Sequence, residues 1–139
     1  MINPEINISD LNNGSMNTMV SYLGIEFTEV GSNYIMAKMP VDNRTKQPMG
    51  LLHGGASVAL AETLGSIGSL LCIDKTKQYP VGLEINANHV KSATSGFVTG
   101  KATIIHLGKK THIWDIRIHN EQNELVCISR LTVAIIDRK

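Results

Sequence analysis

The chain has 139 residues, a formal net charge of +1 and a hydrophobic content of 42%. Its length predicts one domain over residues 1–139, because a chain of this size buries a core of its own. The near-neutral charge excludes a general attraction to nucleic acid or to an anionic membrane surface. One Trp, three Tyr and two Phe are too few for a surface on which bases stack.

The first ten residues, MINPEINISD, lack the basic and apolar regions of a secretory signal. Residues 54–73 are long enough to span a bilayer, but glycines, serines and Glu62 dilute their hydrophobicity. Cys72 and Cys127 lie far apart in apolar contexts and are interpreted as free thiols, with a disulfide as the weaker alternative. These features predict a cytoplasmic protein without a membrane span.

Residues 1–24 are polar with scattered apolar positions, which predicts a short helical segment packed on the domain. Residues 25–31 and 33–41 are rich in β-forming side chains and meet at Gly31 and Ser32, which predicts a hairpin. A polar loop that ends at Pro48 leads into the central segment.

The central segment, from Gln47 to Ile73, contains a single charged side chain, Glu62. On a helical period its large aliphatic residues form one stripe and its small residues form a second. No face carries Lys or Arg, so none has the character of a solvent-exposed face. We expect a central helix that is wrapped on its aliphatic side and approached closely on its small side.

Four further extended runs are predicted at residues 81–91, 96–106, 111–119 and 125–137, with polar or glycine-containing turns between them. Trp114, Ile116 and Ile118 alternate with polar residues, which is the period of a half-buried strand. The order of helix, two strands, long helix and four strands favours an α+β fold. In such a fold, a mostly antiparallel sheet packs on one long helix.

Glu62 is the first candidate for chemistry. Burial disfavours the charged form of a carboxylate, so a lone glutamate in an apolar segment is suited to accept a proton near neutral pH. Such carboxylates cluster at functional sites, although a structural role beside nearby hydroxyls is the alternative interpretation. Ser66 lies one turn further along the predicted helix, where it could orient the carboxylate or a water.

His53, Gly54 and Gly55 stand where this helix is expected to begin. The first N–H groups of a helix are unpaired and carry the positive end of its dipole. Glycine lets a ligand approach these N–H groups closely, and a carbonyl oxygen bound there would be polarised. A glycine-rich helix entry without a ligand is the plainer interpretation of the same residues.

Gly54 and Glu62 cannot both reach one carbonyl group within a single chain. Eight residues of helix separate them by roughly 12 Å along the axis. A two-fold pairing of chains would bring Glu62 of one subunit to the helix start of the other. The spacing therefore predicts an obligate homodimer with two shared sites.

Other motifs limit the chemistry. The five histidines show no HxxxH, HxH or CxxC spacing, so no metal site is predicted, and there is no GxSxG, GxGxxG or P-loop. Lys91, Lys109 and Lys110 stand at the ends of extended runs. Most surface lysines only aid solubility, but these could pair with the phosphates of a large anionic carrier.

Four segments, GLLHGGASVALAE, VGLEINANHVKSA, HLGKKT and SRLTVAII, together resemble the hotdog-fold acyl-CoA thioesterases. The likeness is to the 4-hydroxybenzoyl-CoA thioesterase-like subfamily, whose catalytic glutamate lies on the central helix, and it is close over residues 39–136. It implies hydrolysis of an aromatic acyl-CoA to free acid and coenzyme A, without a metal or redox cofactor. It also implies sites built between the subunits of a homodimer, with dimers pairing into tetramers.

The resemblance also implies roles for individual residues. Glu62 would be the nucleophile or the general base toward the thioester carbonyl, and the Gly54 N–H would hold the carbonyl oxygen. Gln47 and His53 would position the thioester or a water, supported by Ser66. The residues that would bind coenzyme A are Gly82, His89, Val90, Lys91, Ser92, His106, Leu107, Gly108, Lys109, Lys110 and Thr111.

Several alternatives stay open. A broad-specificity thioesterase, or one that proofreads carrier-protein-bound acyl groups, would use the same residues. A hotdog dehydratase or hydratase is less well supported, because the chain lacks the Phe-Pro and Pro-Gly-Val surroundings of such enzymes. A non-catalytic acyl-CoA sensor could use the same groove but would not need Glu62. The sequence does not fix the acyl group.

Overall fold

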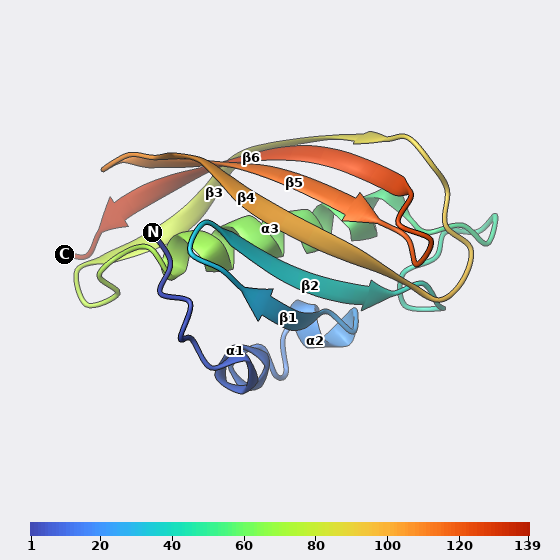
Figure 1. Cartoon of the computed structure of the whole chain (residues 1–139), viewed down its shortest axis with the longest axis horizontal. Coiled ribbons are helices and arrows are strands. Elements are labelled where there is room, and N and C mark those ends of the chain that lie inside the picture. The colour runs from blue at the N-terminus through green and yellow to red at the C-terminus, as the bar shows by residue number, and fades with distance from the viewer.

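A long helix lies against a curved six-stranded sheet in the computed structural model, which describes all of residues 1–139 (Figure 1). Every strand pairing is antiparallel, in the order β1-β2-β4-β5-β6-β3. The expected α+β arrangement is thereby confirmed. The elements are α1 (Ile8–Gly14), α2 (Met19–Tyr22), β1 (Glu26–Val30), β2 (Tyr34–Pro40), α3 (Gly54–Leu70), β3 (Gln78–His89), β4 (Phe97–Leu107), β5 (Thr111–His119) and β6 (Leu125–Asp137).

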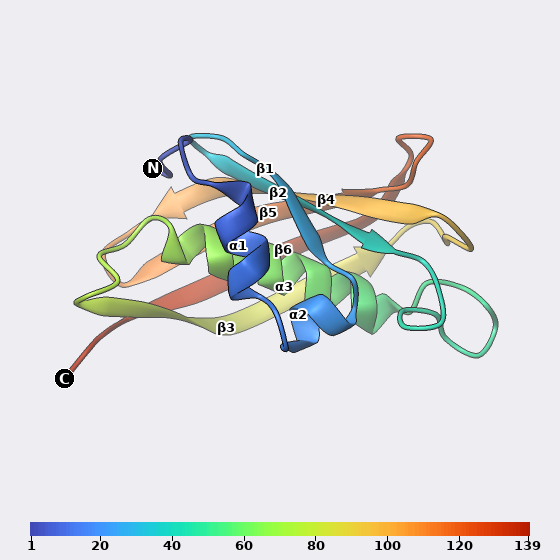
Figure 2. The same cartoon turned by 90° about the horizontal axis from the view of Figure 1, so that it is seen from below.

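The central helix α3 lies between two layers. The sheet curves over one side of it, and the short helices α1 and α2 lie on the other side (Figures 1 and 2). Leu60 and Leu64, from the aliphatic stripe of α3, are fully buried. Alternate residues of the strands face this helix, which gives the period-two burial of β2 and β5.

The small-residue stripe of α3 lets the sheet approach the helix backbone. A methyl group at Gly68 would lie 2.6 Å from the Trp114 ring, and one at Gly65 would lie 2.5 Å from Leu131. The Trp114 indole N–H donates to Ser69 Oγ over 2.8 Å, so this buried polar group is paired. The predicted close approach on this face is confirmed.

One strand boundary was predicted wrongly, because β3 begins at Gln78 and not at residue 81. Pro80 lies inside the strand, opposite Ile135, although proline lacks the N–H that a central strand needs. β3 is an edge strand, paired only with β6, so a missing donor on its free side breaks no hydrogen bond. The other elements fall within a few residues of their predicted positions.

Two further expectations concern the cysteines and the membrane. Cys72 and Cys127 are both free, as predicted, and burial raises the pKa of each thiol. No helix of the structure is both long enough and apolar enough to cross a bilayer.

Candidate active site

The start of α3 presents a free backbone donor. His53 is the N-cap, and its Nδ1 accepts a hydrogen bond of 2.7 Å from the Gly55 N–H. Because Nδ1 is the acceptor, the neutral imidazole carries its proton on Nε2. The Gly54 N–H has no hydrogen-bond partner within the chain. The helix therefore begins at the predicted position, with one donor available to a ligand.

A pocket of about 320 Å³ opens beside this N–H and is called the helix-start pocket. It brings together six residues that the sequence assigns to the site, Gln47, Gly54, His89, Val90, Lys91 and Ser92, with Leu51, Leu52, Ser57 and Val126.

Gln47 and His89 both line the helix-start pocket. Gln47 offers a second hydrogen-bond donor there, in addition to the Gly54 N–H. The Gln47 side-chain oxygen accepts from the Met49 N–H, which leaves the side-chain NH₂ group free to donate. The His89 ring lies against Gly54, because a methyl group added there would be 2.8 Å from Nε2. Glycine at position 54 thus lets His89 come close to the free N–H.

Ser57 is a member of the helix-start pocket that the sequence analysis missed. Its side chain is nearly fully buried, yet its hydroxyl forms no hydrogen bond within the chain. Ser57 lies one turn after Gly54 on the same face of α3, and that spacing is the signal that would have found it.

Glu62 lines a second pocket, of about 370 Å³, called the mid-helix pocket. Its carboxylate is the single charged group there, and Ser66 is the other predicted residue present. The remaining lining residues are Met19, Val20, Leu23, Ile25, Ala59, Thr63 and Ile67. The sequence analysis missed those from the N-terminal segment, because nothing in the sequence places α2 over the middle of α3.

Gly82 lies against the Glu62 carboxylate. A methyl group at Gly82 would overlap Glu62 Oε1. The pairing of β3 with β6 shifts by one residue between Gly82 and Glu84, as in a β-bulge. Gly82 was assigned to coenzyme A by resemblance, and its position shows a further reason for a glycine, namely space for the carboxylate.

The third group of predicted residues lies at the other end of α3. A pocket of about 500 Å³, called the helix-end pocket, contains Leu107, Gly108, Lys109 and Lys110 together with Cys72, Ile73, Asp74, Gln78, Ile135 and Asp137. His106 and Thr111 flank it without lining it. The Gly108 N–H donates to the Thr111 carbonyl over 2.9 Å and closes the turn between β4 and β5.

Two of the three predicted phosphate-binding lysines are paired with carboxylates. Lys91 contacts Glu124, and it contributes more than Asn120 does to lowering the pKa of that carboxyl. Lys110 lies 3.2 Å from Asp137, whose pKa is lowered first by Gln78 and then by Lys110. Lys109 has no ion pair. Exposed ion pairs are weak, so a phosphate can compete for these lysines.

One chain does not bring all the predicted residues to one place. The helix-start and helix-end pockets lie at opposite ends of α3, roughly 25 Å apart for a helix of this length. Glu62 lies between them, on a different pocket from Gly54. The predicted residues therefore lie in three separate places along α3 within one chain.

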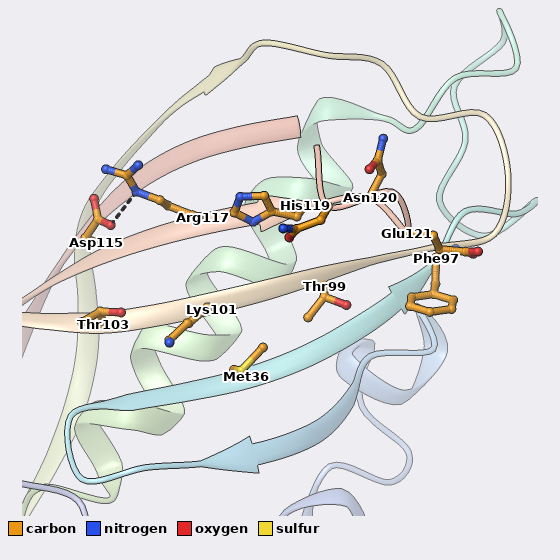
Figure 3. A pocket seen from close by; sticks show the side chains of 11 residues that line it. Met36, Phe97, Thr99, Lys101, Thr103, Asp115, Arg117, His119, Asn120 and Glu121 are labelled. Atoms are coloured by element: carbon orange, nitrogen blue, oxygen red, sulfur yellow. Dashed lines mark hydrogen bonds and ion pairs between the residues drawn. The ribbon is translucent and has the colours of Figure 1, made fainter. Parts of the chain in front are cut away.

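A further pocket, of about 450 Å³, opens on the face of the sheet that points away from α3 (Figure 3). It contains the Arg117–Asp115 ion pair and the side chains of Lys101 and His119. None of the residues predicted for the active site lies in it. Only two of its eleven lining residues, Met36 and Phe97, are hydrophobic, and no helix terminus lies in it, so it is not the candidate active site.

A mostly antiparallel sheet wrapped around one long helix is the hotdog arrangement, and here it carries a free N–H at the helix start and a carboxylate further along the helix. Residues 49–127, more than half of the chain, match the family model described as the thioesterase superfamily. This chain belongs to the thioesterase superfamily and is a thioester hydrolase.

Individual relatives agree with this assignment. The 1,4-dihydroxy-2-naphthoyl-CoA hydrolase of Escherichia coli is 50% identical over 132 residues, which are 95% of this chain and 96% of the relative. A proofreading thioesterase of Cronobacter turicensis is 48% identical over 126 residues, 91% of each chain. The crystal structure of a variant thioesterase from Pseudomonas aeruginosa has a TM-score of 0.96 and 47% identity, and the match covers 99% of each chain.

Proposed function

We propose that this chain hydrolyses aromatic acyl-CoA thioesters, with 1,4-dihydroxy-2-naphthoyl-CoA as the leading substrate. The observation that carries the proposal is Glu62, the one charged group in an otherwise neutral and mostly apolar pocket. The likeness to the E. coli hydrolase supports the acyl group. The family resemblance would place the reaction in menaquinone biosynthesis in the cytoplasm.

In the general-base route, Glu62 takes a proton from a water that attacks the thioester carbonyl carbon. The Gly54 N–H, which has no partner in the chain, stabilises the oxyanion that forms. The tetrahedral intermediate then breaks its C–S bond, and Glu62 returns the proton to the departing coenzyme A thiolate. The products are the free acid and the thiol, so no metal or redox cofactor is needed.

In the nucleophilic route, the Glu62 carboxylate itself attacks the carbonyl carbon and expels the thiolate, which forms an anhydride. Water then cleaves the anhydride. A single turnover in ¹⁸O-water tests this route: label in the Glu62 side chain shows that an anhydride formed and that water attacked its Glu62 carbonyl. Attack of water on the acyl carbonyl of the anhydride, or the general-base route, puts the label in the free acid alone. Mass spectrometry of the peptide that contains Glu62 gives the readout.

The site we propose is shared between two chains. β3 is an edge strand of twelve residues, and Val81 and Leu83 on it are 46% and 63% exposed. A long, partly apolar edge of this kind invites pairing with another strand. A two-fold partner on this side, with its helix antiparallel, would bring Glu62 of one subunit to Gly54 of the other.

The same pairing explains why the residues assigned to coenzyme A lie in two pockets at opposite ends of α3. With Glu62 opposite the partner's helix start, the helix end of one subunit would lie roughly 12 Å from the helix start of the other. Lys109 and Lys110 would then serve the same ligand as the partner subunit's Lys91. Pairing of dimers into tetramers follows from the family resemblance and is part of the proposal.

Thiol release from a panel of aryl- and alkyl-CoA esters tests the proposal. Replacing Glu62 with Gln is expected to lower kcat by a factor of about a hundred or more while the protein stays folded. Glu26→Gln is the matched control, because Glu26 is an exposed glutamate on the far edge strand β1. An enzyme-only blank corrects for Cys72 and Cys127 when the reagent is a disulfide.

The outcomes separate the rival functions. Wild-type turnover in Glu62→Gln would remove Glu62 from the mechanism. Saturable binding of an acyl-CoA without thiol release would favour a sensor, and formation of a double bond would favour a dehydratase.

A second candidate is the proofreading of aryl groups on a carrier protein, which the Cronobacter relative favours. The same aryl group is offered on coenzyme A and on a phosphopantetheinylated carrier domain, and the two kcat/KM values are compared. A higher value for the carrier-bound group would favour proofreading, and a higher value for the coenzyme A ester would favour the leading proposal.

A further inference from the structure

We propose that the mid-helix pocket holds the acyl group of the substrate and that α2 determines which acyl groups fit. This inference rests on the proposed function, because it places the thioester carbonyl at Glu62. Within the pocket, Glu62 is the reacting group, and six of the nine lining residues are hydrophobic. An apolar acyl group gains free energy in such a lining, whereas the charged nucleotide does not.

The N-terminal segment forms one wall of the pocket. Met19, Val20 and Leu23 from α2 and Ile25 just after it line the cavity opposite α3. The Ile25 N–H donates to the Val20 carbonyl over 3.0 Å, which ties the end of α2 to the start of β1. The wall is therefore held by backbone contacts, and its side chains are free to set the size of the pocket.

A capping box fixes the start of α2. Thr18 Oγ1 accepts from the Val20 N–H over 3.2 Å, and Ser21 Oγ accepts from the Thr18 N–H over 3.3 Å. This box orients a helix of only one turn, which has little stability of its own. Met19 is consequently held at the rim, where its side chain is 65% exposed in the chain.

The floor of the pocket comes from α3. Ala59 and Ile67 give apolar surface on either side of Glu62, and Thr63 and Ser66 add two hydroxyls. No lysine, arginine or histidine lines the pocket. The predicted phosphate-binding lysines lie instead in the helix-start and helix-end pockets. The mid-helix pocket therefore suits the acyl group, and the other two pockets suit the phosphates of the nucleotide.

The volume of the pocket suits a ring. About 370 Å³ is within the range of roughly 300 to 1,000 Å³ that is typical of small-molecule sites. Two hydroxyls near the carboxylate give partners for the phenolic groups of a hydroxylated aryl ring. The ligand class we infer is a mono- or bicyclic hydroxyaryl acyl group.

Two variants test the inference, one that fills the pocket and one that enlarges it, and neither residue belongs to the catalytic set. Ala59→Leu fills the floor, and Met19→Ala removes part of the wall. The ratio of kcat/KM for 2-naphthoyl-CoA to that for butanoyl-CoA is measured in each. Ala59→Leu is expected to lower this ratio by about tenfold, and Met19→Ala to change it by a few-fold, as expected for lost pocket contacts.

Met16→Ala is the matched control, because Met16 is an exposed methionine of the same segment that does not line the pocket. It should leave the ratio unchanged. A ratio that stays at the wild-type value in both Ala59→Leu and Met19→Ala, or that changes equally in Met16→Ala, would overturn the inference.

Binding of 2-acetonaphthone, a neutral naphthyl ketone, is measured by fluorescence in the same proteins. This readout tests the pocket without turnover. Binding that Ala59→Leu weakens supports the acyl site even if no ester is cleaved, in which case only the proposed function fails. The reverse outcome is also possible: turnover depends on Glu62, but Ala59→Leu changes neither the binding of the ketone nor the kcat/KM ratio. In that case the proposed function stands and the proposed acyl site is wrong.

Discussion

Gly82 shows how a residue without a side chain can serve the chemistry. It lies on the edge strand β3, directly against the Glu62 carboxylate, and a methyl group there would overlap Oε1. The clash would be with the end of a flexible side chain, so the fold could accommodate it by moving Glu62 alone. A methyl group at Gly82 would therefore displace the Glu62 carboxylate while leaving the packing of the core nearly unchanged.

Replacing Gly82 with alanine is expected to lower kcat by about ten- to a hundredfold, because small displacements of a reacting group are costly. The midpoint of thermal unfolding should stay close to that of the wild type. Gly14→Ala is the control, since a methyl group at Gly14 meets nothing within 4 Å. Full turnover in Gly82→Ala would show that Glu62 is not held where the structure places it.

At the scale of elements, α3 was predictable because its information is local. Three signals lie within one segment: the absence of Lys and Arg from residues 54–70, the small stripe at Gly65 and Gly68, and the glycine pair after His53. The wall of the mid-helix pocket was not predictable, since Met19 and Glu62 meet only through packing of α2 on α3. The start of β3 was missed because a proline normally ends a strand, and Pro80 is tolerated only because β3 lies at the edge of the sheet.

The N-cap of α3 gives a prediction at this scale, because His53 both caps the helix and carries a free Nε2–H. Asparagine also caps well, so His53→Asn should keep the stability, whereas His53→Ala should lose about 1 kcal/mol of unfolding free energy. Both variants should lower kcat by about tenfold if Nε2–H donates to the substrate. Chemical denaturation and thiol release measure the two effects separately. Full turnover in His53→Asn would leave the histidine with a capping role alone.

At the scale of the whole molecule, the geometry of one chain is the ground on which a homodimer is predicted. Four of the five predicted catalytic residues fall into two pockets, with Gln47 and Gly54 in one and Glu62 and Ser66 in the other. The fifth, His53, caps the start of α3 and lines neither pocket. The sequence predicted this separation from the helical rise, and α3 does run without a break from Gly54 past Glu62 to Leu70. The oligomer itself stays a prediction, because the sequence and the single chain define the edge of β3 but not what pairs with it.

Complementation between two inactive variants tests the shared site. In a dimer formed from one Glu62→Gln chain and one Gln47→Ala chain, one site combines the intact Glu62 with the intact Gln47, and the other site lacks both. Random pairing makes half of the dimers mixed, so co-expression should restore about a quarter of the wild-type rate. Each variant expressed alone gives the baseline. If Glu62 and Gln47 acted within one chain, every site in the mixed dimer would carry one defect, and the rate would stay at the mean of the two baselines.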